Sequence, residues 1–494
     1  MKKLICILLV LVLVLGLCAC GGENAGGNDQ TESNVLQAGY ARMNCIPDDR
    51  LVHIAGDDAA NDPATDGLLD NLAITCVALK KGEDTYLIYT CDIVDIMDFY
   101  KETESTVSEA TGVPVSNIIL NATHTHSAPT LKPSDTKLPG RNNYERKFIK
   151  VSTEVATAAI ADLSPVSKLS YGSIQTEDMV RVRHYLMNDG TSYGSGHGST
   201  ASGYKDHLYP ADEECQVIRI SLEAEDKKDI VMMNLGAHAT IVSGTHTSAL
   251  SADFPFPARQ YVEENADVRC AYFIAAGGDQ APNSKIPGVV KNKADHFAYG
   301  KQLGGYVVEC LKNMTDSTTD GIVLYNETFT ADRMKDGVDD PDLMEKAKEI
   351  VELKRQYGSN SAPAVKEKCN EYGMTYYGAS ALVSRASAPD TGSFPIGTML
   401  LGDIGIVFFP GEMFGSQGKT LKEESPTPFT FVVTCSEDDQ GYFPNEIAKQ
   451  EKFYEYNTTK YVMGTGEAVC KRYCQILGAL KDGAQVPAQP ATNP

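Results

Sequence analysis

Apolar runs that alternate with segments of helical periodicity constrain the fold of this chain more than any other feature. Residues 72–79 and 85–95 are rich in Ile, Val, Leu and Tyr, and a polar turn separates them, which is typical of two neighbouring strands. A helix is predicted at 100–111, ended by Gly112 and Pro114, and apolar residues recur at helical spacing over 143–163. This order predicts an α/β fold with mixed β-sheets flanked by helices.

The remainder of the chain continues this alternation. The apolar pattern predicts more strands, at 168–183, 215–222, 229–235, 270–276, 398–409 and 429–435, and more helices, at 255–263, 295–314, 341–357 and 465–480. The polar stretch 187–210 is predicted to be a loop, and the Ser/Ala/Pro-containing stretch after 357 a looser peripheral continuation. We therefore expect one large domain over residues 35–482, followed by a disordered tail over 483–494 that is rich in Pro, Ala and Gln.

The N-terminus has the layout of a signal peptide. Lys2 and Lys3 precede an apolar run over 4–17, which is too short to span a bilayer comfortably as a helix. The exit of this run, Leu17-Cys18-Ala19-Cys20, resembles a bacterial lipobox with Cys20 as the acylated residue. We expect a signal peptide over 1–19 and a lipid-anchored flexible tether over 20–34, which would give an extracytoplasmic lipoprotein of the cell membrane. Plain secretion after Ala19 is the alternative.

Charge and cysteine content restrict the partners. The chain has 66 acidic and 44 basic side chains and a formal net charge of −22, which argues against nucleic acids and anionic surfaces as partners. Ten of the 13 cysteines follow the predicted lipidation site, from Cys45 to Cys474. Their spacing is that of neither a disulfide-dense scaffold nor a Cys-X-X-Cys zinc site, so buried thiols are predicted for most of them.

Two histidines follow the apolar run 118–120, in the stretch Asn121-Ala122-Thr123-His124-Thr125-His126. Residues two apart in an extended chain point the same way, so His124 and His126 are predicted to reach one site. Ser127, Ala128 and Pro129 predict a turn, which places that site at the C-terminal end of a strand. Two structural histidines in a half-buried strand are the alternative.

Three further polar residues each follow an apolar run, and they are His238, Glu412 and Tyr442. Functional side chains collect at the exits of strands in sheet scaffolds. Two imidazoles and a carboxylate make a good zinc site. Each of the three residues on its own is also compatible with a structural role.

Taken together, these stretches resemble a known family. The order and spacing of four motifs are similar to those in the catalytic domain of neutral (non-lysosomal) ceramidases and their bacterial relatives, over nearly all of residues 35–480. The motifs are His124-Thr125-His126-Ser127, Gly278-Asp279-Gln280-Ala281-Pro282-Asn283, Pro410-Gly411-Glu412, and Gly441-Tyr442 with Tyr454-Glu455 downstream. The resemblance implies a ceramidase-like catalytic fold.

The resemblance also implies the roles of particular residues. It implies one Zn²⁺ per chain, held by His124, His238, Glu412 and Tyr442. His126 would then hydrogen-bond the substrate or move a proton. Arg183, with Arg181 as the alternative, would stabilise charge on the carbonyl oxygen as it develops.

Other residues of these motifs are candidates for lining the site. Asp279, Gln280 and Asn283 are predicted either to line it or to form turns. Ala281 stands where the resemblance leads us to expect a serine, so a serine nucleophile is excluded at this position and activated water remains. Asp253 is predicted either to orient a ligand through a hydrogen bond or to cap the following helix.

The activity that the resemblance implies is zinc-dependent hydrolysis of an amide bond by metal-activated water. The implied substrate is a lipid-like small molecule, an N-acyl lipid such as ceramide, and the predicted tether would hold the enzyme near it. Two alternatives stay open at this point. One is a metal-dependent esterase that uses the same residues, and the other is a non-catalytic solute- or carbohydrate-binding lipoprotein with the same signal-and-tether layout.

Overall fold

The computed structural model describes residues 34–48, 52, 54, 64, 66–96, 100–129, 140–194, 203–244, 248–283, 289–290 and 293–489. The predicted signal peptide, Cys20 and almost all of the predicted tether lie outside the described residues. Among the helices that are described, none is both long enough and apolar enough to cross a membrane. The C-terminal stretch after Lys481 lies partly against the fold, since Pro487 O accepts a hydrogen bond from Arg472 at 2.8 Å.

A nine-stranded mixed sheet forms the larger half of the molecule, in the order β14-β12-β11-β6-β1-β3-β4-β5, with β18 also beside β6. The pairs β4/β5 and β12/β14 are parallel, and the other pairs are antiparallel. In chain order the strands are β1 (Gln37–Asn44), β3 (Ala73–Lys81), β4 (Asp84–Cys91), β5 (Ile118–Ile119), β6 (Ser164–Gln175), β11 (Glu214–Leu222), β12 (Ile230–Leu235), β14 (Arg269–Ile274) and β18 (Thr315–Ser317).

A second sheet of four strands packs face to face on the first. Its strands are β19 (Ile322–Asp332), β20 (Thr391–Leu401), β21 (Ile404–Phe408) and β23 (Phe429–Val433), of which β21 and β23 are parallel. Alternate side chains point to opposite faces of a strand, so Ile218 and Ile220 of β11 enter the core between the sheets with Ile406 and Phe431. Val217 of β11 faces the opposite side, towards helices.

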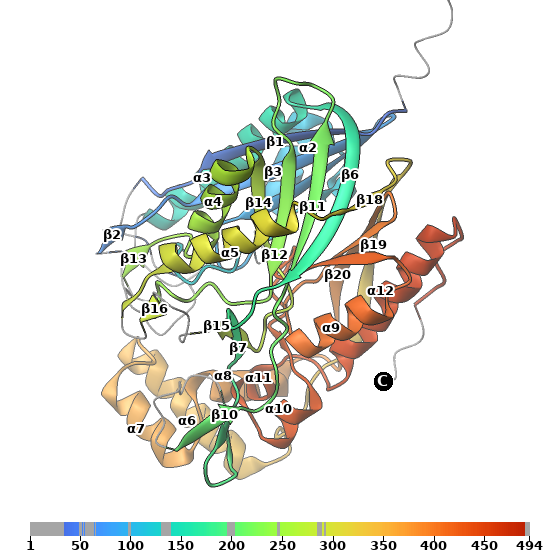
Figure 1. Ribbon diagram of the computed structural model, residues 1–494. Coiled ribbons are helices and arrows are strands. Elements are labelled where there is room, and N and C mark those ends of the chain that lie inside the picture. Colours follow the sequence, from blue (N-terminus) through green and yellow to red (C-terminus); the bar gives the residue numbers. More distant parts are fainter. Residues whose placement is uncertain are drawn as a thin grey trace, which may run out of the picture.

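Helices cover both outer faces and complete four layers in the order helix, sheet, sheet, helix (Figure 1). On the large sheet these are α2 (Tyr100–Thr111), α3 (Gly140–Ala161), α4 (Pro255–Ala266) and α5 (His296–Cys310). On the small sheet they are α9 (Gly415–Glu424) and α12 (Thr465–Lys481). The predicted fold class, α/β with mixed sheets flanked by helices, is confirmed.

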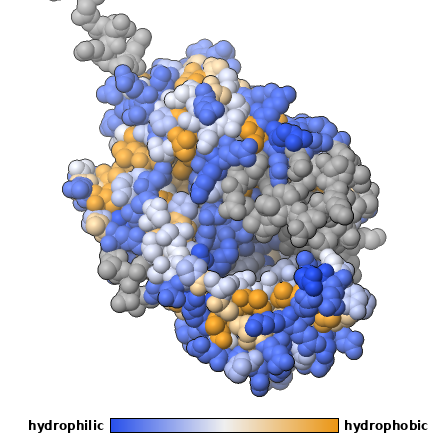
Figure 2. Space-filling view, turned by 180° about the vertical axis from the view of Figure 1, so that it is seen from behind, coloured by the Kyte–Doolittle hydropathy of each residue, from blue (hydrophilic) through white to orange (hydrophobic). Residues whose placement is uncertain are grey.

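A helical lobe lies below the sandwich in Figure 1. It contains α6 (Pro341–Tyr357), α7 (Pro363–Tyr372) and α8 (Tyr376–Ser387), which enclose a small core of their own. The prediction of a looser continuation after 357 is wrong, because Pro363 begins α7 and the Thr375 hydroxyl caps α8 by accepting from Gly378 N at 3.0 Å. Seen from behind, hydrophobic residues gather on the surface at this end of the molecule (Figure 2).

Short strands and helices connect these layers. The stretch 187–210, predicted to be a loop, instead contributes to a small sheet of β8 (Tyr185–Met187), β9 (Ser192–Tyr193) and β10 (Tyr204–His207). The other short elements are β2 (Gly67–Leu68), η2 (Val115–Asn117), β7 (Val180–Val182), β13 (Ala249–Leu250), β15 (Gln280–Pro282), β16 (Val289–Val290), β17 (Lys293–Ala294), β22 (Glu412–Met413), β24 (Tyr442–Phe443), α10 (Glu446–Gln450) and α11 (Tyr454–Thr458). The ten cysteines from Cys45 to Cys474 are free thiols, and eight of them are buried.

Candidate active site

His124 and His126 converge through a bend in the backbone. The strand that precedes them, β5, ends at Ile119, and His124 has a positive φ of 60°. The predicted alternation along an extended strand is therefore wrong at His124, because a left-handed residue turns the chain out of the strand. Thr125 then pairs with Ala239, and the two imidazole rings meet edge to face with centroids 4.9 Å apart. Such a strained conformation in a non-glycine residue is common at functional sites.

Main-chain carbonyls orient the rings of His124 and His238. His124 Nδ1 lies 2.6 Å from Val94 O, and His238 Nδ1 lies 2.9 Å from the carbonyl oxygens of both Gly277 and Gln280. A carbonyl oxygen only accepts, so Nδ1 is the donor in each ring. Each Nε2 of the neutral ring then carries a lone pair, and this is the arrangement that most metal-binding histidines have.

The Glu412 carboxylate meets both Nε2 atoms. Its Oε2 lies 2.9 Å from His238 Nε2 and 3.3 Å from His124 Nε2, yet these three buried atoms make no hydrogen bond among the described residues. Ligand atoms held about 2.0–2.1 Å from a tetrahedral zinc ion lie about 3.3–3.4 Å from one another. The spacing and the orphaned lone pairs therefore fit a shared cation.

The charges around these side chains also favour a cation. Burial opposes the charged form of Glu412, but His124 and His238 hold its pKa well below the usual range, so it is a carboxylate. Burial and the neighbouring Arg183 lower the pKa of His238 to about 3, so it is neutral. Burial likewise opposes a charged His124, but Cys435 and Glu412 raise its pKa well above the usual value. The Glu412 carboxylate thus stabilises positive charge at His124, whereas the charge of Arg183 disfavours it at His238.

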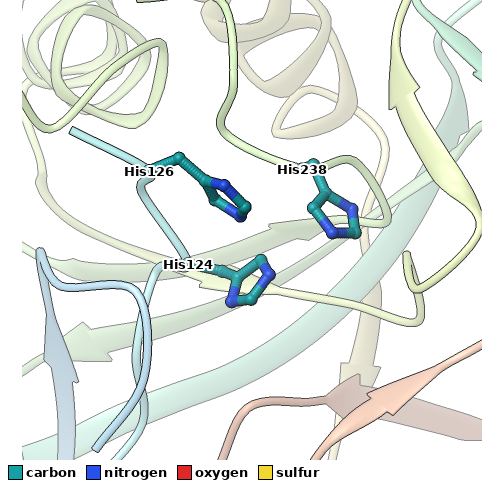
Figure 3. A group of neighbouring side chains, drawn as sticks. All are labelled: His124, His126 and His238. Carbon is teal, nitrogen blue, oxygen red and sulfur yellow. The ribbon is translucent and has the colours of Figure 1, made fainter. Parts of the chain in front are cut away.

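The described part of the chain contains one cluster of three or more His, Cys, Asp or Glu residues with ligand atoms close enough to hold a metal. It consists of His124, His126 and His238, whose ligand atoms all lie within 4.8 Å of one another (Figure 3). A second possible set replaces His126 by Glu412, which contacts the other two histidines. The two short contacts of Glu412 favour the second set, with His126 beside it.

Tyr442 and Arg183 also lie at the candidate site. Glu412 in β22 is directly opposite Tyr442 in the parallel strand β24, and the Arg183 guanidinium lies 5.7 Å from the centre of the Tyr442 ring. Burial lowers the pKa of Arg183, but Tyr442 and Glu455 raise it by more than burial lowers it, so the guanidinium stays charged. Arg181, the alternative in the sequence, instead donates to Pro282 O at 3.0 Å. The structure thus brings Arg183 to the site.

The Gly-Asp-Gln stretch supports the site mainly through its main chain. Gln280 O accepts from His238, whereas its side chain bonds the main chain of Asp212 and donates to Gly236 O at 2.6 Å. The Asp279 carboxylate is buried and accepts from Gly415 N at 2.8 Å. Asn283 is also buried, and its main-chain N–H donates to Met179 O at 2.7 Å. The polar contacts described for Gln280 and Asp279 are therefore with neighbouring loops.

Ala281 and Asp253 lie away from the histidines in their described contacts. Ala281 is buried in β15, opposite Arg181 of β7. The Asp253 carboxylate accepts from Val242 N at 2.7 Å and Phe254 N at 2.6 Å, and burial raises its pKa to about 6. The N-cap residue of α4 is Phe254, so Asp253 fastens the loop before the helix and is not the cap that the sequence suggested.

Glu455 and His184 are two buried residues at the site to which sequence reasoning assigned no role. Glu455 Oε1 accepts from Arg183 Nη2 at 3.0 Å, and Glu455 Oε2 lies 3.0 Å from His184 Nε2. Both side chains are fully buried. The signals were present, because His184 follows Arg183 directly and Glu455 lies in the Tyr454-Glu455 stretch of the resemblance.

Comparison with known proteins supports the fold. No protein-family profile and no curated protein sequence matches the chain. Among solved structures, the neutral ceramidase from Pseudomonas aeruginosa is similar with a TM-score of 0.66 and 15% identity, covering 93% of this chain and 77% of that chain. A ceramidase complexed with C2 is similar with a TM-score of 0.64 and 13% identity, covering 93% and 77%. The chain therefore has a neutral ceramidase-like fold.

Proposed function

We propose that this protein is a zinc-dependent amidohydrolase that cleaves the amide bond of an N-acyl lipid of the ceramide type. The observation that carries the proposal is the convergence of the Glu412 carboxylate on the unpaired Nε2 atoms of His124 and His238. Tyr442, directly opposite Glu412, would be the fourth ligand of a single Zn²⁺. The likeness of the fold to two ceramidase structures supports the choice of substrate class.

The reaction needs three functions, and the site has a candidate for each. A zinc ion bound by these residues would supply a Lewis acid and an activated water at neutral pH. His126, whose ring lies 4.9 Å from that of His124, would give a proton to the departing amine. Arg183 would donate hydrogen bonds to the carbonyl oxygen as negative charge develops on it. Ala281 has no nucleophilic group, which agrees with attack by water.

The proposed location matches the proposed substrate. A lipid anchor on Cys20 would hold the domain outside the cell at the membrane surface. N-acyl lipids are apolar and partition into membranes, so an anchored enzyme would meet them there. The many acidic side chains of the chain favour an uncharged or zwitterionic lipid over an anionic one.

Metal analysis of the purified full-length protein tests the site. We expect about one zinc per chain in the wild type and a large loss in His124→Ala and Glu412→Ala, because each removes one of four ligands. Glu423→Ala is the matched control, since Glu423 is an exposed glutamate on α9. A wild type that stays metal-free in zinc-containing buffer, or a Glu412→Ala variant with full zinc occupancy, would contradict the assignment of these residues as zinc ligands.

A substrate panel tests the activity. Fluorescent N-acyl sphingosines, N-acyl amino acids and simple esters are offered to the wild type, and the same variants and control are run beside it. Preferential hydrolysis of the N-acyl sphingosines supports the proposal. Hydrolysis of esters alone identifies the esterase alternative, and no hydrolysis of any substrate by a zinc-loaded protein contradicts catalysis.

A further inference from the structure

A network of buried and half-buried polar side chains leads away from Arg183. Glu455, at the start of α11, accepts from Arg183 Nη2 and contacts His184 Nε2, each at 3.0 Å. His184 Nδ1 lies 2.8 Å from the Tyr209 hydroxyl, which donates to Asp279 Oδ2 at 3.0 Å. This hydrogen-bond network thus joins the segment between β7 and β8, the loop before β11, the Gly-Asp-Gln stretch and α11.

The polarity of these hydrogen bonds follows from the groups involved. Tyr209 has one proton, and it goes to Asp279, so the hydroxyl accepts from His184 Nδ1. Burial raises the pKa of Glu455, but His184 and Arg183 lower it overall, so Glu455 is a carboxylate and accepts from His184 Nε2. Both ring nitrogens of His184 then donate. His184 thus links the Glu455 carboxylate to the Tyr209 hydroxyl, and Tyr209 continues the hydrogen bonds to Asp279.

Packing fixes the central histidine. The ring of His184 stacks on Phe453, the residue before α11, with centroids 4.1 Å apart and planes inclined by 24°. Asp279 is held in turn, because its Oδ1 accepts from Gly415 N and its main-chain oxygen accepts from Arg183 N, both at 2.8 Å. His184 is therefore held by its ring face and by both of its nitrogens.

The consequence for Arg183 is geometric. Its Nη2 donates to both Glu455 Oε1 and Gly278 O, at 3.0 and 2.6 Å, so two acceptors anchor this nitrogen. Its Nε is buried and has no hydrogen-bond partner among the described residues. An unsatisfied buried donor is costly, and it is typical of a group that is completed by a ligand. The guanidinium also lies over the ring of Tyr442, 5.7 Å from its centre.

We propose that Glu455 and His184 are positioning residues that hold the Arg183 guanidinium at the reaction site, and that Tyr209 and Asp279 fix His184 in turn. The proposal rests on the proposed function and adds the residues that act through Arg183. Buried ionic networks are poor stabilisers compared with apolar packing. A network of this kind is therefore better explained by the orientation it imposes than by a contribution to folding.

A double-mutant cycle on the full-length protein tests the proposal. Glu455→Gln keeps the shape but removes the charge, so we expect kcat to fall by about 100-fold with KM nearly unchanged, because small misplacements of a catalytic group have effects of this size. Zinc content should stay at the wild-type value. In an Arg183→Ala background the same substitution should have little further effect. Equal losses in the two backgrounds would show a general structural role and overturn the proposal.

Two further variants guard against misfolding and non-specific effects. Tyr209→Phe removes a single hydroxyl with almost no change in volume, and we expect a smaller fall in kcat, about 3–10-fold, that also vanishes without Arg183. Tyr456→Phe is the matched control on α11, because its hydroxyl bonds Asp336 at 2.6 Å on the exposed side. A wild-type kcat in Tyr209→Phe would contradict the proposed role of Tyr209 and Asp279 in fixing His184.

Crystal structures of the wild type and Glu455→Gln separate this proposal from the proposed function. If the wild type hydrolyses none of the amides, the proposed function fails, and the position of Arg183 can still be read. A guanidinium displaced from Tyr442 in Glu455→Gln supports the positioning role. A guanidinium that has not moved overturns it.

Discussion

Two buried carboxyl groups, those of Glu104 and Glu437, should make the free energy of unfolding of this protein fall as pH rises. Glu437 Oε1 accepts from Leu120 N, and Glu437 N donates to Leu120 O, both at 2.8 Å. Glu104 of α2 hydrogen-bonds to Glu437. Burial raises the pKa of Glu104 and the nearby Glu437 raises it further, and burial also raises the pKa of Glu437. The folded pair therefore keeps a proton that the unfolded chain releases.

The sign and size of the effect follow from proton linkage. A raised pKa in the folded state gives a stabilisation that is fully present below the unfolded pKa, about 4.3 for Glu, and is lost as pH rises towards the folded pKa. One such proton changes the free energy of unfolding by about 1.4 kcal/mol per pH unit. Between pH 5.5 and 8.5 the pair can therefore reduce the stability by up to about 4 kcal/mol. Glu104→Gln keeps a donor for Glu437 and does not titrate.

Urea unfolding at pH 5.5, 7.0 and 8.5 measures this effect. We expect Glu104→Gln to match the wild type within about 1 kcal/mol at pH 5.5 and to be increasingly more stable at pH 7.0 and 8.5. Glu102→Gln is the matched control, since Glu102 is exposed on the same helix. If the wild type and Glu104→Gln lose stability in parallel over this range, the pair holds no extra proton and the reasoning is refuted.

Two further substitutions test the packing around the site. In Gly278→Ala the new Cβ would lie 2.5 Å from Glu412 O, so Glu412 must move, and we expect the affinity for zinc to fall by about 10–100-fold. Gly321→Ala is the control, because its Cβ would meet nothing within 4 Å and should leave the affinity unchanged. Equal affinities of the two variants in a zinc titration would contradict this prediction. Asp92→Asn leaves the buried Arg259 without the carboxylate whose two oxygens lie 2.7 and 2.8 Å from its guanidinium nitrogens. We expect the free energy of unfolding, measured with urea, to fall by about 3–5 kcal/mol. A fall of less than about 1 kcal/mol would count against a buried ion pair.

The sequence alone determined most of the individual elements. The helix predicted at 341–357 coincides with α6, and the one predicted at 465–480 differs from α12 by one residue, because apolar spacing and capping residues act within a few turns. The helices α7 and α8 were not predicted, since α7 is short and mostly polar and α8 is rich in Ser and Ala, so that both have a weak apolar pattern. The stacking of two sheets into four layers was not predicted either, since it depends on contacts between distant strands.

The sequence also supplied the residues that the structure brings together at the candidate site. His124, His238, Glu412 and Tyr442 each follow an apolar run, and strand exits are local features that a sequence reader can find. Their assignment to a metal came from resemblance, and the distances between them came from the fold. Glu412 lies opposite Tyr442 only because β22 and β24 pair in parallel with that register.

Only the tertiary structure decided the orientation of these side chains. The bend at His124 and the carbonyl oxygens of Val94 and Gly277 select which ring nitrogen faces Glu412. The link from Arg183 to Glu455 joins residues 272 positions apart. Hydrogen-bond partners at such separations are set by how strands pair and layers stack, whereas periodicity records only which face of an element is apolar. The sequence therefore determined which chemical groups were available, and the packing of the two sheets determined where their lone pairs and charges point.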